Sequence, residues 1–274
     1  MEIDRRLFIG SLGGAAVVAS MSHEGRAEAL EHYMSDLLEQ SGDADTADDT
    51  RPKFPTAAEV EAEIETRPFR RGAGGLFVSA AGNVKKLAPM PARPTLADFF
   101  QLRFTTVNHC LQSATDALKK GEPEDIVLAC LLHDLVHTLM KTDHGWWGAQ
   151  MFEPYVSEKI TFAIRYHQAL RFYPDHAAGY EYPDLYKKMF GEDYSPPPHI
   201  QAAYRYAKDH KLYMAARLVT VHDLYAFDPA AKVSLDPFVD IIGRHFKQPK
   251  EGLGNDNSPV AHFWRTMSAP DTPL

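Results

Sequence analysis

From Thr95 onward, apolar residues recur at the three- and four-residue spacing of amphipathic α-helices. Thr95–Asp98 has the form of a capping box, and the first helix is predicted to run from there to Lys119, with Gly121 as its stop. Further helices are predicted from Pro123, over 157–173, over 199–227 and over 236–246, the last capped by Asp236. The pattern therefore predicts an all-α domain of roughly five core helices.

The rest of the chain lacks this long helical pattern. Short helices are predicted at 28–38 and 56–66, and the Gly- and Pro-punctuated segment 67–94 is predicted to form a small hairpin or irregular lid. A Tyr- and Pro-rich excursion at 173–198 is predicted to face the substrate and to contain a short helix. The predicted organisation is a signal at 1–30, an N-terminal extension and linker at 31–94, the helical core at 95–247, and a loop-like tail at 248–274 that packs in part through Trp264.

The N-terminus carries paired arginines, Arg5 and Arg6, before a weakly apolar Gly/Ala-rich stretch at 10–21. This arrangement resembles a twin-arginine export signal, which predicts recognition by the twin-arginine export machinery and a periplasmic protein. The alternative is a helical or disordered tail on a cytoplasmic protein. The stretch is too short for a stable membrane span.

Composition narrows the class of protein. The chain of 274 residues with 45% hydrophobic content can bury one sizeable core. Its formal charge of −8 argues against a nucleic-acid-binding surface, which needs clustered Lys and Arg. Cys110 and Cys130 do not define a disulfide framework, and two buried thiols are favoured over a disulfide.

The sharpest chemical signal is His133–Asp134, which lies inside the apolar run 126–136. Burying an imidazole beside a carboxylate is costly unless something compensates them, and a metal ion is the usual compensation. His137 follows at helical spacing and is predicted to share a face with this pair. The pair alone would also fit an ordinary core histidine with a carboxylate partner.

Further His and Asp residues lie on the other predicted helices. Together with the central pair they form a sparse set in the order His109, His133, Asp134, His144, His167 and Asp223. Four imidazoles and two carboxylates suit two iron or manganese ions, because both metals accept nitrogen and oxygen donors and a carboxylate can bridge them.

These six positions, in this order, resemble the HD-domain superfamily over about His109 to Asp223. Two subgroups are the most similar, and both are mixed-valent diiron oxygenases. The residues Asp134–His137, Asp143–His144 and His167 resemble the oxygenase that cleaves a hydroxylated aminophosphonate. The segment His222–Tyr225 resembles the last-ligand segment of myo-inositol oxygenase.

The resemblance implies a role for each of these positions. One iron would be held by His109, His133 and Asp223, the other by His144 and His167, with Asp134 between them. It also implies that His137 is a substrate-contacting or supporting residue rather than a ligand. Arg171 and Lys141 would either meet an anionic group of the substrate or be surface residues.

The chain departs from the phosphonate enzyme between His167 and Asp223, where Tyr and Pro replace a Gly-rich substrate-binding segment. Three functions are therefore considered. The first is a diiron oxygenase that uses O2 to cleave a small hydroxylated substrate. The second is an HD-type phosphohydrolase using Mn²⁺ or Mg²⁺, disfavoured by the shortage of Lys and Arg near the site. The third is a non-catalytic metal-binding or helical interaction protein.

Overall fold

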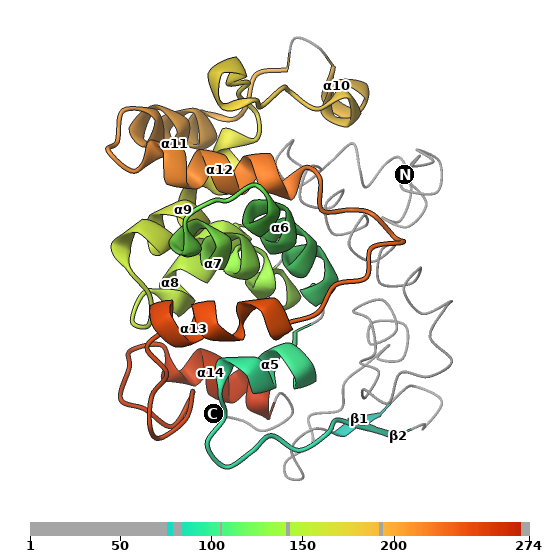
Figure 1. The fold of residues 1–274 in the computed structure, drawn as a ribbon, viewed down its shortest axis with the longest axis vertical. Coiled ribbons are helices and arrows are strands. Elements are labelled where there is room, and N and C mark those ends of the chain that lie inside the picture. The colour runs from blue at the N-terminus through green and yellow to red at the C-terminus, as the bar shows by residue number, and fades with distance from the viewer. Residues whose placement is uncertain (1–75, 79–83, 105, 141–142, 192–193, 270–274) are drawn as a thin grey trace.

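The computed structural model describes residues 76–78, 84–104, 106–140, 143–191 and 194–269 (Figure 1). The predicted signal at 1–30 and the helices predicted at 28–38 and 56–66 lie outside them. The elements are β1 (Leu76–Val78), β2 (Val84–Lys86), α5 (Leu96–Leu102), α6 (Val107–Lys119), α7 (Glu124–Leu132), η1 (Leu135–Thr138), α8 (His144–Phe152), α9 (Glu158–Leu170), η2 (His176–Ala178), α10 (Asp184–Phe190), α11 (Pro198–Lys208), α12 (Tyr213–Asp223), η3 (Asp236–Phe238), α13 (Val239–His245) and α14 (Ala261–Ser268). The all-α prediction is confirmed for this part of the chain.

Helix α7 lies in the middle of the bundle and packs against α6, α9, α12 and α13 (Figure 1). All residues of 126–132 are buried, because a helix that is apolar on every side must be enclosed by others. Glu124 and Asp125 occupy its first turn, where the helix dipole favours acids. The predicted start is confirmed. However, α7 ends at Leu132, and His137 lies in the separate turn η1 rather than on the same α-helix.

The helix predicted over 95–119 is two helices, α5 and α6. The capping box at its start is confirmed, since the Thr95 side chain accepts a hydrogen bond from the Asp98 backbone N–H at 3.2 Å. The break follows Arg103, whose guanidinium donates to the carbonyls of Met267 and Ser268 at the end of α14. This contact joins segments more than 160 residues apart, and the local pattern contains no sign of it.

The C-terminal segment belongs to the core. Trp264 on α14 is fully buried, with its ring centroid 4.8 Å from that of Phe99 and 5.9 Å from that of Phe152. Packing through Trp264 is confirmed. The prediction of a loop-like tail is wrong at 261–268, where an amphipathic helix closes the lower end of the bundle in Figure 1.

Two other predicted helices differ in detail. The segment 199–227 contains α11 and α12, separated at 209–212 by a mainly polar run without Gly or Pro. Asp236 does not cap a helix, because the chain enters α13 through the 3-10 turn η3, whose N-cap is Leu235. The excursion at 173–198 holds η2 and α10, as predicted.

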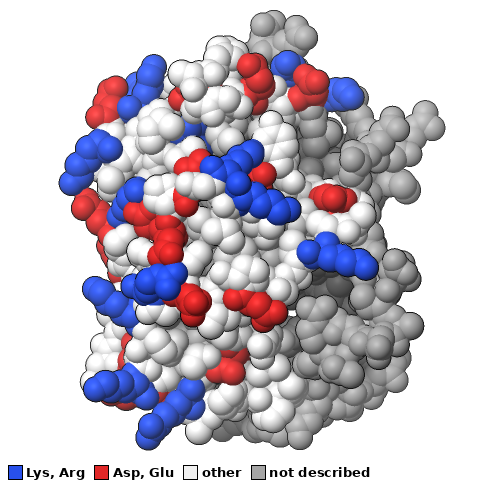
Figure 2. Space-filling view, viewed as in Figure 1, with Lys and Arg blue, Asp and Glu red and all other residues white. Residues whose placement is uncertain are grey.

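The smaller predictions are also settled. β1 and β2 pair in antiparallel fashion, which confirms the predicted hairpin. Cys110 and Cys130 are buried free thiols, which confirms the favoured interpretation. None of the described helices combines the length and the apolar character that a bilayer crossing needs. On the face seen in Figure 2, acidic and basic side chains of the described residues are interspersed.

Candidate metal centre

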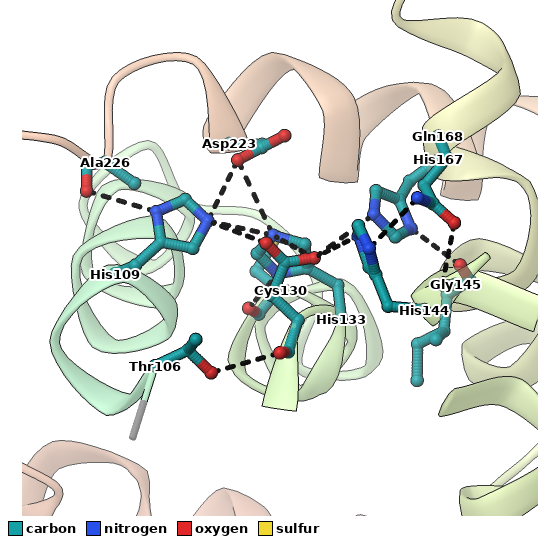
Figure 3. Close-up of polar contacts among 12 residues, drawn as sticks. Thr106, His109, Cys130, His133, His144, Gly145, His167, Gln168, Asp223 and Ala226 are labelled. Atoms are coloured by element: carbon teal, nitrogen blue, oxygen red, sulfur yellow. Dashed lines mark hydrogen bonds and ion pairs between the residues drawn. The ribbon is translucent and has the colours of Figure 1, made fainter. Parts of the chain in front are cut away.

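Six buried or nearly buried side chains from separate helices converge between α6, α7, α9 and α12 (Figure 3). They form two groups that share Asp134 and that could each hold a metal ion. The first group is His109, His133, Asp134 and Asp223, and the second is Asp134, His144 and His167. We call His109, His133 and Asp223 the first half of the centre, and His144 and His167 the second half. These are the six residues singled out in the sequence.

The first half brings its donor atoms to the separation that one ion requires. His109 Nε2 lies 3.0 Å from Asp223 Oδ1 and 3.2 Å from His133 Nε2. His133 Nε2 lies 3.6 Å from Asp223 Oδ1. Donors bound at about 2.1 Å in neighbouring octahedral positions lie about 3 Å apart. The three side chains therefore match one face of an octahedral ion.

Asp134 lies between the two halves. Its Oδ1 is 2.9 Å from His144 Nε2 and 3.4 Å from His167 Nε2. Its Oδ2 is 3.4 Å from His109 Nε2. Its Oδ1 also lies 3.5 Å from His133 Nε2. Because this carboxylate meets imidazoles of both halves, it has the placement of a bridge between two ions.

The end of α7 sets the direction of this carboxylate. His133 is the C-cap of α7 and keeps helical backbone angles, whereas Asp134 changes to φ −110° and ψ 2° before η1 begins. The Thr106 hydroxyl donates to the Asp134 carbonyl at 3.0 Å and ties this turn to the start of α6. The helix thus stops where its apolar run gives way to the two polar side chains that meet the centre.

His144 is the first residue of α8. The preceding Asp143 has left-handed backbone angles, with φ 54°. Gly145 lies against α9, where an added Cβ would come within 2.8 Å of the Ile164 carbonyl oxygen. The close approach of α8 and α9 therefore brings His144 and His167 to the same carboxylate.

Three of the four imidazoles are oriented by backbone carbonyls, which accept a hydrogen bond from Nδ1–H and leave Nε2 to the centre. The pairs are His109 with Ala226 (3.2 Å), His133 with Cys130 (2.7 Å) and His167 with Ile164 (2.6 Å). His144 differs, because its Nδ1 lies 3.0 Å from the side-chain amide nitrogen of Gln168.

Burial and charge act in opposite directions at this centre. Burial lowers the pKa of His109, but Asp134 and Asp223 outweigh it and raise this pKa to about 10. Burial also lowers the pKa of His133, but Asp134 and Asp223 outweigh it, so this pKa is raised. Neighbouring histidines hold the pKa of Asp134 well below its usual range despite its burial. At His167 burial prevails and lowers the pKa.

The donor set fits a cation. Asp134 Oδ1 and His167 Nε2 are buried and have no hydrogen-bond partner among the described residues. Leaving such atoms uncompensated is costly, and a metal ion between them would satisfy both. Nitrogen and carboxylate donors together suit first-row divalent metals such as iron and manganese.

The other predicted site residues lie outside both donor groups. His137 is buried, with its ring 4.8 Å from that of His144. Arg171 is 2% exposed, so the alternative of a surface arginine is wrong, and its guanidinium lies over the Phe172 ring at 5.1 Å. Lys141 is outside the described residues. His222 belongs to neither donor group, and its Nδ1 forms a hydrogen bond of 2.7 Å with Asp116 Oδ2.

Two supporting residues were not predicted. Gln168 connects the second half to the start of α8, since its Oε1 also accepts from the Gly145 backbone N–H at 2.8 Å. Phe227 stacks on the His109 ring with centroids 4.4 Å apart. A glutamine directly after His167 on the buried face of a helix was a usable signal for Gln168. Nothing local marks Phe227, because its contact with α6 is made by the tertiary fold.

Comparison with known proteins gives a partial match. No protein-family model matches the chain. Over 80 residues, however, the chain is 35% identical to the [1-hydroxy-2-(trimethylamino)ethyl]phosphonate dioxygenase (glycine-betaine-forming) of Leisingera caerulea. The match covers 25% of this chain and 41% of that enzyme, so it spans less than half of the relative's length. The chain is thus a distant relative of an oxygenase that acts on a phosphonate.

Proposed function

We propose that the protein is an HD-domain dinuclear metalloenzyme, and that it is a non-haem diiron oxygenase. The observation that carries the proposal is the pair of donor groups sharing Asp134. Four imidazoles and two carboxylates, one of them placed as a bridge, form a donor set suited to two iron ions. The similarity to a phosphonate dioxygenase favours oxidative chemistry at this centre.

The first-half residues and Asp134 would hold one iron, and His144 and His167 with Asp134 would hold the other. When bound, the two irons supply activation of O2 for oxidative C–C or C–P cleavage. The protein contributes a site enclosed by α6, α7, α9 and α12, which excludes bulk water. The carbonyl groups facing Nδ1 of three histidines keep those rings fixed.

The proposed substrate is a small hydroxylated molecule with an anionic group that Arg171 or Lys141 meets. His137 would contact the substrate or support His144, whose ring it faces edge-on. The excursion at 173–198 brings a cluster of aromatic rings after Arg171: Phe172, Tyr182, Tyr186, Phe190 and Tyr194. We assign specificity to this segment, because it replaces the Gly-rich segment of the phosphonate enzyme.

The second candidate is a metal-dependent phosphohydrolase with Mn²⁺ or Mg²⁺ in the same donor groups. The bridging placement of Asp134 favours it equally, because two ions about 3.5–4 Å apart can hold a hydroxide for attack on a phosphoester. The similarity to an oxygenase ranks it second.

One experiment separates the two candidates. Purified protein is loaded anaerobically with Fe²⁺ or with Mn²⁺, and metal content, O2 uptake and phosphoester hydrolysis are measured. The substrate panel contains hydroxylated phosphonates, polyols and 1,2-diols. Two irons with substrate-dependent O2 uptake and no hydrolysis support the oxygenase. Hydrolysis with Mn²⁺ and no O2 uptake overturns it in favour of the hydrolase. If two metals are bound but neither activity is found, a non-catalytic protein is favoured.

We also propose export by the twin-arginine machinery through residues 1–30. The test replaces Arg5 and Arg6 by Lys in the full chain and follows its location by fractionation. Periplasmic accumulation that the double substitution abolishes supports export. A cytoplasmic location of both proteins contradicts it.

A further inference from the structure

The side-chain amide of Gln168 has only one orientation that satisfies its neighbours. Gly145 presents a backbone N–H, which can only donate, 2.8 Å from Gln168 Oε1. The oxygen of the amide must therefore face Gly145, and its NH2 group must face His144 Nδ1 at 3.0 Å. Gln168 and His144 are 5% and 0% exposed, so water does not replace these contacts.

This orientation determines the tautomer of His144. An NH2 group can only donate, so His144 Nδ1 accepts and the ring proton lies on Nε2. Nε2, which carries the proton, lies 2.9 Å from Asp134 Oδ1, but the two atoms are not aligned for a hydrogen bond. His133 and His167 are opposite in this respect, because a carbonyl faces Nδ1 in each of them.

A metal ion on His144 Nε2 creates a conflict that no simple rotation removes. The ion needs the Nε2 lone pair, so the ring proton moves to Nδ1 and meets the NH2 group of Gln168. Turning the amide over would place this NH2 group against the Gly145 N–H instead. Gly145 lies close against α9, where an added Cβ would come within 2.8 Å of both Gln168 Oε1 and the Ile164 carbonyl oxygen. In either case, two buried N–H donors face each other with no acceptor between them, which is unfavourable.

We propose that Gln168 is a positioning residue that lowers the affinity of the second half for its metal ion. It does so by holding His144 in the tautomer that carries its proton on Nε2, the nitrogen that a metal ion would need. The inference rests on the proposed metal centre. Its consequence is that His144 is the ligand released most readily, which leaves an exchangeable coordination position beside the bridge.

The decisive variant is Gln168→Glu, because a carboxylate accepts from both the Gly145 N–H and a His144 Nδ1–H. We expect the second ion to bind about tenfold to a hundredfold more tightly, with the affinity of the first half unchanged. The measurement is titration of the metal-free protein with Co²⁺, followed by visible spectroscopy and calorimetry. Gln112→Glu is the matched control, since it places the same charge on a buried glutamine of α6 that does not contact these histidines.

A second readout is independent of metal binding and of activity. Nitrogen-15 NMR of histidine-labelled, metal-free protein reports the tautomer of each ring, and His144→Gln identifies the signal. We expect a proton on Nε2 of His144 in the wild type and on Nδ1 in Gln168→Glu, with circular dichroism confirming that both are folded.

The outcomes are distinguishable. An Nδ1–H tautomer at His144 in the wild type overturns the inference. An unchanged second-ion affinity in Gln168→Glu, or an equal gain in Gln112→Glu, also overturns it. If the wild type binds no second ion at all, the dinuclear function fails instead, while the tautomer measurement still tests the hydrogen-bond assignment.

Discussion

The two halves of the centre use different means to place similar side chains. The first half takes His109, His133 and Asp223 from α6, from the end of α7 and from the end of α12, and includes a carboxylate of its own. The second half takes His144 and His167 from two adjoining helices and depends on the bridging carboxylate alone. A first ion would thus have four donors from the protein and a second would have three.

This difference suits the first half to tight metal binding and the second half to reaction at a metal. More donors and a second negative charge favour tight binding in the first half. Under the proposed function, fewer protein donors would leave more open positions in the second half for substrate or O2. The wild-type protein is therefore expected to lose its second ion first when it is dialysed against a chelator.

The largest effect is expected where the halves meet. Asp134→Asn removes the shared negative charge and replaces one of the two carboxylate oxygens by an NH2 group, which cannot bind a metal. The bridge is then broken, so both ions should be lost and activity should fall by more than about a hundredfold. Metal content by mass spectrometry measures the loss. Asp116→Asn is the control, because Asp116 meets His222 rather than the centre. Two ions retained in Asp134→Asn would contradict the bridging role.

The next effect should separate the halves. His167→Ala should lose one metal equivalent and keep the first ion, because His167 belongs only to the second donor group. His133→Ala should weaken the first ion instead, since its Nε2 lies near His109 and Asp223. Titration with Mn²⁺ followed by electron paramagnetic resonance distinguishes one bound ion from a coupled pair. Loss of both ions in His167→Ala would show that the halves are not separable.

The sequence predicts which residues come together in the two donor groups better than it predicts the helices that carry them. The six residues could be found because a histidine or an aspartate in an otherwise apolar helix needs compensation, which is a property of residue type and spacing. Helix ends were predicted less well. The α5–α6 break depends on Arg103 meeting the end of α14, and no local pattern encodes such a contact.

The same limit explains the missed supporting residues. Gln168 acts through Gly145 and His144, which belong to a different helix from its own. Its role requires the packing of α8 on α9, which periodicity does not specify. Trp264 was identified as a packing residue because a tryptophan is rarely left in solvent, but the helix around it was not predicted.

The pH dependence of metal binding should differ between the halves. The pKa of His109 is raised to about 10 and that of His133 is also raised, so an ion entering the first half displaces protons. Its affinity should fall as the pH falls from about 8 to about 6, by on the order of tenfold per pH unit for each proton displaced. Burial lowers the pKa of His167, so this ring is already neutral and the second half should show a shallower slope. Calorimetry in two buffers of different protonation enthalpy checks this, and equal slopes would contradict it.

A smaller effect is expected where α8 approaches α9. Gly145→Ala would place a Cβ 2.8 Å from the Ile164 carbonyl oxygen, so α8 must shift and carry His144 with it. We expect the second ion to bind about tenfold more weakly, while the first is unaffected. Gly243→Ala on α13 is the control, because an added Cβ there meets nothing within 4 Å. An unchanged second-ion affinity in Gly145→Ala would show that the approach of the helices does not set the geometry.

The smallest effect concerns the first half alone. Phe227 stacks on His109 with an interplanar angle of 23°, and it adds an aromatic wall to a ring whose Nδ1 is already held by the neighbouring Ala226 carbonyl. Phe227→Leu keeps an apolar side chain but removes a stacking interaction of about 0.5–1.5 kcal/mol. The first ion should therefore bind roughly two- to tenfold more weakly, as measured by competition with a chromogenic chelator. If Phe227→Leu weakened binding of the second ion instead, the position of His109 would act through Asp134 more than on its own ion. The two halves would then behave as one unit.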